Sequence, residues 1–158
     1  MTHQVDAWVP LEGNPEKLAD ALRDPPPLWL PEPVDARGPG HWGFPAHAGP
    51  VTRLVTCRVG DAGGTGTTVR RHLHWQADPE PHEPGEEAGR SLPSFIGTLE
   101  LRAVGERRVD LRLDGGYEPP EGPIGAALSP AQVRLLAETS IRMFLADVAD
   151  RLLATVED

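Results

Sequence analysis

The last thirty residues, Ser129 to Asp158, carry the only long uninterrupted helical pattern of this chain. Ser129-Pro130-Ala131-Gln132 places a serine at the N-cap, a proline at the first helical position and a glutamine that can close a capping box. A helix from Pro130 to Ala154 would be about 37 Å long, enough to span a small domain. Mostly apolar residues recur on one face of this predicted helix: Val133, Leu136, Ala137, Ser140, Ile141, Phe144, Val148 and Leu152.

Composition narrows the class of protein. We expect the 158 residues to form a single domain, residues 1–158, with a core of its own. The net charge of -9 argues against a nucleic-acid surface, which needs clustered Lys and Arg. Charges interrupt the C-terminal helix every few residues, so we expect no membrane insertion. The single Cys57 excludes an internal disulfide, and no apolar leader follows Met1, so we predict a cytoplasmic protein.

Upstream of the helix, several segments alternate apolar and polar residues, as strands with one buried face do. A short helix is predicted after the Asn14-Pro15 start signal, ending before Pro25. Two proline-rich segments are interpreted as loops: Asp78–Pro93, which is also acidic, and Pro25–Pro50, either a short helix around Leu28–Leu30 plus a lid, or a mobile segment. The predicted strands are His3–Leu11, Val51–Val59, Thr67–Ala77, Ser94–Val104 and Val109–Tyr117. This order of elements predicts an α+β fold, a curved antiparallel sheet with one long helix.

Three segments carry a family resemblance: Ser94–Leu101 (SFIGTLEL), Leu113–Pro120 (LDGGYEPP) and Gly122–Gly125 (GPIG). With them, the chain from Val51 onward resembles the SRPBCC superfamily of START-like, Bet v 1-like and polyketide cyclase-like proteins, in the pattern of bacterial members. The resemblance implies a helix-grip fold, in which the curved antiparallel β-sheet wraps around the long C-terminal α-helix and an apolar cavity lies between them. Members bind lipids, sterols or polyketides, and some are cyclases. The chain departs from many relatives at Ala126–Pro130, where those have an arginine or histidine at the helix start.

On this expectation, inward-facing residues of the sheet and helix bind the ligand. Arg53 and Arg71 could anchor an acidic head group, or could extend to solvent from the strand ends. The Tyr117 hydroxyl could reach a ligand or hydrogen-bond the Pro-Pro turn that follows it, and back-bonding to the helix is the simpler role for Ser140. The predicted ligand-binding residues are Arg53, Arg71, Trp75, Leu99, Leu113, Tyr117, Ser140 and Phe144.

The histidines and the glycine-rich segment give weaker indications of a metal, catalytic or phosphate site. His72 and His74 share one strand face, but no third metal ligand lies near them in sequence, so we expect them to be solvated and predict no metal site. His41 and His47 could line a pocket mouth as acid–base groups, although loop histidines usually have no chemical role. Gly60–Gly66 lacks the ending of a phosphate loop and is interpreted as a hairpin turn. We predict no cofactor and no catalytic residue.

The leading hypothesis is therefore a non-catalytic carrier or sensor of a small apolar ligand, lipid- or polyketide-like. One alternative is a polyketide cyclase or dehydratase in which Arg71, Tyr117 or a loop histidine assists proton transfer. Another is a protein-interaction module that uses the acidic Asp78–Glu87 loop or an exposed Trp8. A homodimer is left open.

Overall fold

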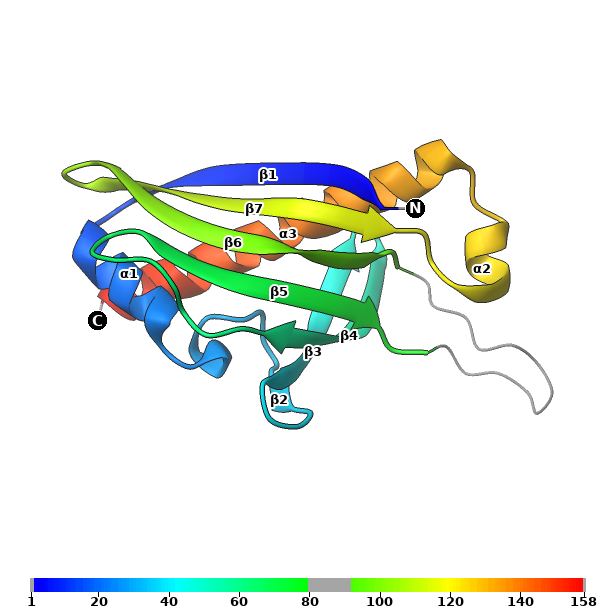
Figure 1. Cartoon of the computed structure of the whole chain (residues 1–158), viewed down its shortest axis with the longest axis horizontal. Coiled ribbons are helices and arrows are strands. Elements are labelled where there is room, and N and C mark those ends of the chain that lie inside the picture. The colour runs from blue at the N-terminus through cyan, green and yellow to red at the C-terminus, as the bar shows by residue number, and fades with distance from the viewer. Residues whose placement is uncertain (1, 80–91, 158) are drawn as a thin grey trace.

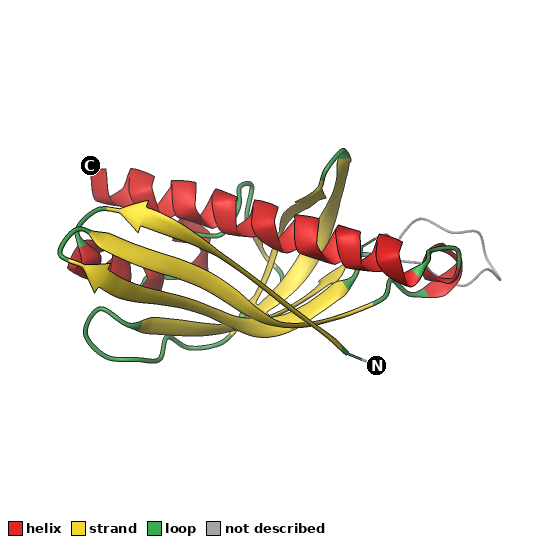
Figure 2. Ribbon diagram, turned by 90° about the horizontal axis from the view of Figure 1, so that it is seen from above, coloured by secondary structure: helices red, strands yellow, loops and turns green. Residues whose placement is uncertain are grey.

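In the computed structural model, which describes residues 2–79 and 92–157, antiparallel strands form a seven-stranded sheet in the order β1-β7-β6-β5-β4-β3-β2. The sheet curls around α3, the long C-terminal helix (Figures 1 and 2). The strands are β1 (His3–Glu12), β2 (Asp35–Ala36), β3 (His41–Ala48), β4 (Val51–Val59), β5 (Val69–Ala77), β6 (Ser94–Gly105) and β7 (Arg108–Glu118). The helices are α1 (Pro15–Arg23), the 3-10 helix η1 (Pro26–Leu28), α2 (Gly122–Ala126) and α3 (Pro130–Glu157). The predicted α+β helix-grip architecture is confirmed.

Helix α3 begins with the predicted capping box. The Ser129 backbone N–H donates to Gln132 Oε1 at 2.8 Å, and the Gln132 N–H donates to Ser129 Oγ at 3.2 Å. The predicted stripe is buried in the concave face of the sheet, apart from the half-buried Leu136. None of the helices in the described part of the chain is long and apolar enough to cross a membrane.

A pair of glycines shapes the bend of the sheet. Gly97 in β6 and Gly115 in β7 lie directly opposite each other. A Cβ on Gly115 would come within 2.6 Å of Gly97 Cα, and a Cβ on Gly97 would come equally close to the ring of Phe95. The two strands therefore approach more closely than side chains would allow, and the sheet can fold over the helix.

Helix α1 and η1 close one end of the space between the sheet and α3 (Figure 1). The Asn14 side chain caps α1, because its Oδ1 accepts from the N–H groups of Glu16 at 2.9 Å and Lys17 at 3.1 Å. Arg151 of α3 donates to the Pro27 carbonyl oxygen at 2.8 Å, which ties η1 to the long helix. This end of the molecule is therefore sealed.

The segment Pro25–Pro50 is more regular than its composition predicts. Its short helix is the 3-10 turn η1, earlier than the expected Leu28–Leu30, and residues 41–48 form the full strand β3. The sequence pattern did not predict β3 because Pro45 lies inside it. The pairing with β2 covers only Trp42 and Gly43, so β3 is an edge strand at Pro45, where a missing N–H is tolerated. Most of the predicted Asp78–Pro93 loop, residues 80–91, lies outside the described residues.

Candidate functional site

Aromatic rings fill the middle of the space between the sheet and α3. The Phe144 ring centroid of α3 lies 4.9 Å from that of Trp75 and 5.5 Å from that of Phe44. The Trp75 ring also packs against Phe95, with centroids 4.7 Å apart. All four side chains are buried, so they hold the sheet onto the helix.

Most of the predicted ligand-binding residues belong to this packed interior. The Ser140 hydroxyl donates to the Ala137 carbonyl oxygen at 3.0 Å, the back-bonding considered from the sequence. An apolar molecule would reach these side chains only if the aromatic rings moved. The members of the predicted set in this interior are Trp75, Leu99, Leu113, Ser140 and Phe144.

Arg71 is also buried, with 6% of its surface exposed, but it lies at the closed end of the space. Its Nη1 is 3.4 Å from the carbonyl oxygens of both Leu22 and Arg23, in the last turn of α1. Its guanidinium lies 5.5 Å from the centroid of the Trp29 ring. Burial lowers the pKa of Arg71, and the charge of Asp61 partly offsets this effect. Arg71 therefore hydrogen-bonds the carbonyl groups at the C-terminal end of α1, where the helix dipole favours a cation.

Arg53 does not lie among buried apolar neighbours as expected. It is exposed on β4 near the hairpin that joins β3 and β4, where its Nη1 donates to the Thr52 carbonyl oxygen at 2.8 Å. Arg53 and Arg71, both predicted to anchor an acidic head group, thus lie in different environments.

A groove opens at the other end of the molecule, between the end of β7 and the first turn of α3. Its volume is about 390 Å³ and its walls are mainly apolar. We call it the open-end groove; it is lined by His3, Tyr117, Pro119, Gly125, Leu128, Pro130, Ala131, Val133 and Arg134. It occupies one end of the space that the sequence predicted between sheet and helix.

The sheet side of the open-end groove is set by the pairing of β1 with β7. In this register His3 lies opposite Tyr117, and their rings stack with centroids 5.3 Å apart and planes inclined by 27°. Tyr117 is 5% exposed, and its hydroxyl makes no hydrogen bond to a described residue. Of the two roles considered for this hydroxyl, the bond to the Pro-Pro turn is absent from the described residues.

The helix side depends on the turn that leads into α3. Gly122 has a φ of 79°, a conformation that favours glycine, and this allows α2 to start one residue after the Pro-Pro segment ends. A Cβ on Gly125 would overlap the carbonyl oxygen of Pro120, so only glycine permits this close turn. The turn brings Leu128 beside Val133 and the capped start of α3.

Arg134 supplies a charged group on the rim of the groove. Its Nε donates to Glu138 Oε1 at 2.8 Å, and this hydrogen bond raises the pKa of Arg134. Because the two charges are paired, they add no net charge to the rim.

The remaining candidate groups lie elsewhere. His72 and His74 are exposed on the convex face of the sheet, and no cluster of three or more metal-ligating side chains occurs among the described residues. His41 and His47 are in β3, where their Nδ1 atoms contact the Pro39 carbonyl oxygen and the Thr52 hydroxyl. Neither lines the open-end groove.

The environment of Cys57 does not favour a reactive thiolate. Its side chain is fully buried in β4, and burial raises the pKa of its thiol to about 12. At neutral pH the thiol stays protonated, and it behaves as a small apolar core residue.

The sequence pointed to one groove residue, Tyr117, and missed the others. The signal was the family resemblance of the segment Leu113–Pro120, which contains Tyr117. His3 carried no such signal, because it reaches the groove only through the pairing of β1 with β7.

No protein-family model matches this chain, and no curated protein matches its sequence. Solved structures do match its fold. The chain is similar to the Zhui aromatase/cyclase from Streptomyces sp. R1128, with a TM-score of 0.62, 12% identity and coverage of 99% of this chain and 94% of that one. It is also similar to a START superfamily protein from Mycobacterium smegmatis, with a TM-score of 0.56, 16% identity and coverage of 98% and 97%.

A third similar structure is Ara h 8.0201, with a TM-score of 0.52, 15% identity and coverage of 98% of this chain and 99% of that one. At these identities the likeness concerns the fold. The curved sheet, the long terminal helix and these neighbours agree, and the chain therefore has the helix-grip fold that it shares with the START superfamily protein and the other neighbours.

Proposed function

We propose that this protein binds a small apolar molecule, lipid- or polyketide-like, in the open-end groove, and that it acts as a carrier or sensor. The observation that carries the proposal is the mainly apolar groove of about 390 Å³ between Tyr117 of β7 and Val133 of α3. Its volume falls in the range of pockets that hold small organic molecules. Apolar walls of this kind favour a ligand that loses apolar surface to water on binding.

The polar groups of the groove define the ligand further. The Tyr117 hydroxyl has no protein partner among the described residues, and the His3 ring lies beside it. These two groups can orient a hydroxyl or a carbonyl of the ligand. Arg134 is already paired with Glu138, so the rim does not demand an anion. A neutral apolar molecule with one polar group fits this arrangement better than a free acid.

The packed aromatic cluster limits how deeply the ligand extends. Phe144 and Trp75 pack against each other in the middle of the molecule and do not line the groove, so the ligand lies between the end of the sheet and the start of α3. A larger ligand would require these rings to move.

A second candidate function is an enzyme of the cyclase or dehydratase type. The observation that favours it is the pair of titratable side chains, His3 and Tyr117, on the wall of an apolar groove. One fold neighbour is an aromatase/cyclase, which supports this candidate at the level of the fold alone. Arg71 is buried at the closed end and does not line the groove, so an enzyme here would depend on His3 and Tyr117.

The test is the uptake of a neutral fluorescent probe, a fluorescently labelled fatty alcohol, with native mass spectrometry of the gently purified protein to detect a retained ligand. In Leu128→Arg a guanidinium enters the groove wall, and we expect the affinity to fall at least about tenfold because a charge is costly in an apolar site. The matched control is Leu135→Arg, because Leu135 is 62% exposed on α3 and does not line the groove.

Equal uptake by both variants and the wild type would reject the open-end groove as the site. No uptake of any member of a broad apolar panel by the wild type would reject the carrier function itself. Tyr117→Phe separates the two candidate functions. If the protein is a carrier, this variant should weaken ligand binding by roughly fivefold, the effect of one hydrogen bond. If the protein is an enzyme, the wild type should convert a polyketide-like substrate and the variant should not.

A further inference from the structure

The convex face of the sheet, which points away from α3, carries rows of charged side chains that are mostly paired. Arg70 and Arg102 both bind Glu100, at 2.7 Å and 3.2 Å. Arg112 binds Asp6 at 3.2 Å across the strand pair β1–β7. Such ion pairs, within and between strands, satisfy the cations of this face without any ligand.

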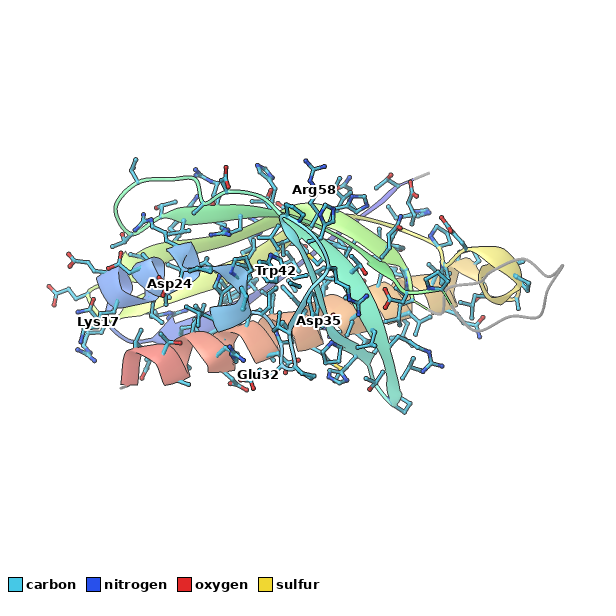
Figure 3. The ribbon with its side chains drawn as sticks, turned by 90° about the horizontal axis from the view of Figure 1, so that it is seen from below. Lys17, Asp24, Glu32, Asp35, Trp42 and Arg58 are labelled. Atoms are coloured by element: carbon cyan, nitrogen blue, oxygen red, sulfur yellow. The ribbon has the colours of Figure 1, made fainter. Side chains whose placement is uncertain are left out.

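One row differs. Arg58 of β4 is exposed on the side of the sheet opposite α3 (Figure 3), directly between His41 of β3 and His74 of β5. The Arg58 side chain makes no ion pair or hydrogen bond with any described residue, and the row contains no carboxylate. Three basic side chains directly opposite one another repel when they are charged. The row is therefore short of negative charge, although the whole protein carries a net charge of -9.

The carboxylates of the neighbouring row do not relieve this shortage. Arg37 Nε binds Asp35 at 2.8 Å, and Arg37 Nη1 binds Asp78 at 2.8 Å. Thr56 donates to the other oxygen of Asp78 at 2.9 Å. These hydrogen bonds commit both acids to Arg37, whose pKa they raise.

A hollow of about 430 Å³ adjoins Arg58 and His74. It forms where Gly60, at the end of β4, carries no side chain, and Ile96, which is 55% exposed, supplies an apolar wall. His72 lines the same hollow, and its Nδ1 lies 3.2 Å from the Thr98 hydroxyl, which holds the ring in place. The hollow thus combines unpaired basic groups with apolar surface.

We propose that this hollow is a second binding site, for a small molecule that carries a phosphate or carboxylate group on an apolar body. The oxyanion binds between Arg58 and His74, where the guanidinium can donate two hydrogen bonds. The apolar body covers Ile96. The site lies on the opposite face of the sheet from the open-end groove and does not depend on the function proposed for that groove.

The test uses three probes that share one ring size: phenyl phosphate, benzoate and the neutral benzyl alcohol. Binding is followed through the ring resonances of His72 and His74 in NMR spectra. We expect saturable shifts with phenyl phosphate or benzoate, and affinity at least about tenfold weaker for benzyl alcohol, since a charge-assisted hydrogen bond is lost.

The variant Arg58→Gln should weaken the binding of the anionic probes about tenfold or more. The matched control is Arg102→Gln, which removes an exposed but paired arginine from the same face and should leave affinity within about twofold. Both positions are exposed, so both variants are expected to fold. Shifts that do not saturate, equal affinity for benzyl alcohol, or unchanged affinity in Arg58→Gln would each overturn the proposal.

Discussion

Truncation of Phe144 tests whether the space between the sheet and α3 is solidly packed. Phe144 is 3% exposed and contacts the rings of Phe44 and Trp75 at centroid distances of 5.5 Å and 4.9 Å. Replacing a buried phenylalanine by alanine typically costs about 3–5 kcal/mol, and each aromatic pair contributes about 0.5–1.5 kcal/mol beyond its buried area. With two such pairs lost, we expect Phe144→Ala to lower the free energy of unfolding by about 4–5 kcal/mol.

The measurement is urea unfolding followed by tryptophan fluorescence, with the slope of the transition as a check on two-state behaviour. Phe144→Leu, which keeps more of the volume, should lose about 1–2 kcal/mol and remains measurable if the alanine variant is too unstable. Leu135→Ala is the control on the exposed side of α3 and should change stability by less than about 0.5 kcal/mol.

The same variant creates a cavity that the wild type lacks. Benzene should therefore raise the melting temperature of Phe144→Ala by more than that of the wild type, because dry apolar cavities bind such molecules and the open-end groove is common to both proteins. A loss of less than about 1.5 kcal/mol, or equal stabilisation of the wild type and Phe144→Ala by benzene, would show that the ring already borders a void. The description of the packed interior would then be wrong.

The other predictions concern single groups. Ser129→Ala removes the capping box of α3 and should cost about 1 kcal/mol in thermal unfolding, whereas Ser129→Asp should restore most of it. Cys57, with its pKa raised to about 12 by burial, should resist a thiol reagent at pH 8 in the native protein and react in denaturant; rapid native labelling would contradict its burial. Burial raises the pKa of Asp147, although the charge of His47 partly lowers it. Folding therefore favours the protonated acid, and the stability that this group contributes is lost as the pH rises through its folded pKa. Asp147→Asn should therefore raise the melting temperature at pH 7, with a gain that shrinks toward acidic pH; a constant gain would contradict this explanation.

Much of the fold could be predicted from local patterns. The alternation in Val51–Val59 matches β4 residue for residue, and the Asn14 and Ser129 caps begin α1 and α3 as predicted. These predictions succeeded because strand faces and helix caps depend on residues two to four positions apart. The strand β3 was missed because its pairing, and not its composition, tolerates Pro45.

The candidate site was predictable only in part. Tyr117 was found because a distinctive segment surrounds it, whereas His3 arrives from the other end of the chain through the β1–β7 register. Arg53 and Arg71 have the same place in their alternating patterns, yet one is exposed and the other lies against the end of α1. Alternation specifies the face of a strand, but it does not say what covers that face.

The sequence by itself determined the long capped helix, the strands that wrap it and the inward face of each. Only the tertiary structure decided that four aromatic rings fill the middle of the concavity and that the groove opens at its end. It also decided that Arg58 stands between two histidines without a carboxylate. The reason is physical: helix and strand periodicity is a short-range property, while packing density and charge pairing depend on residues that only the folded chain brings together.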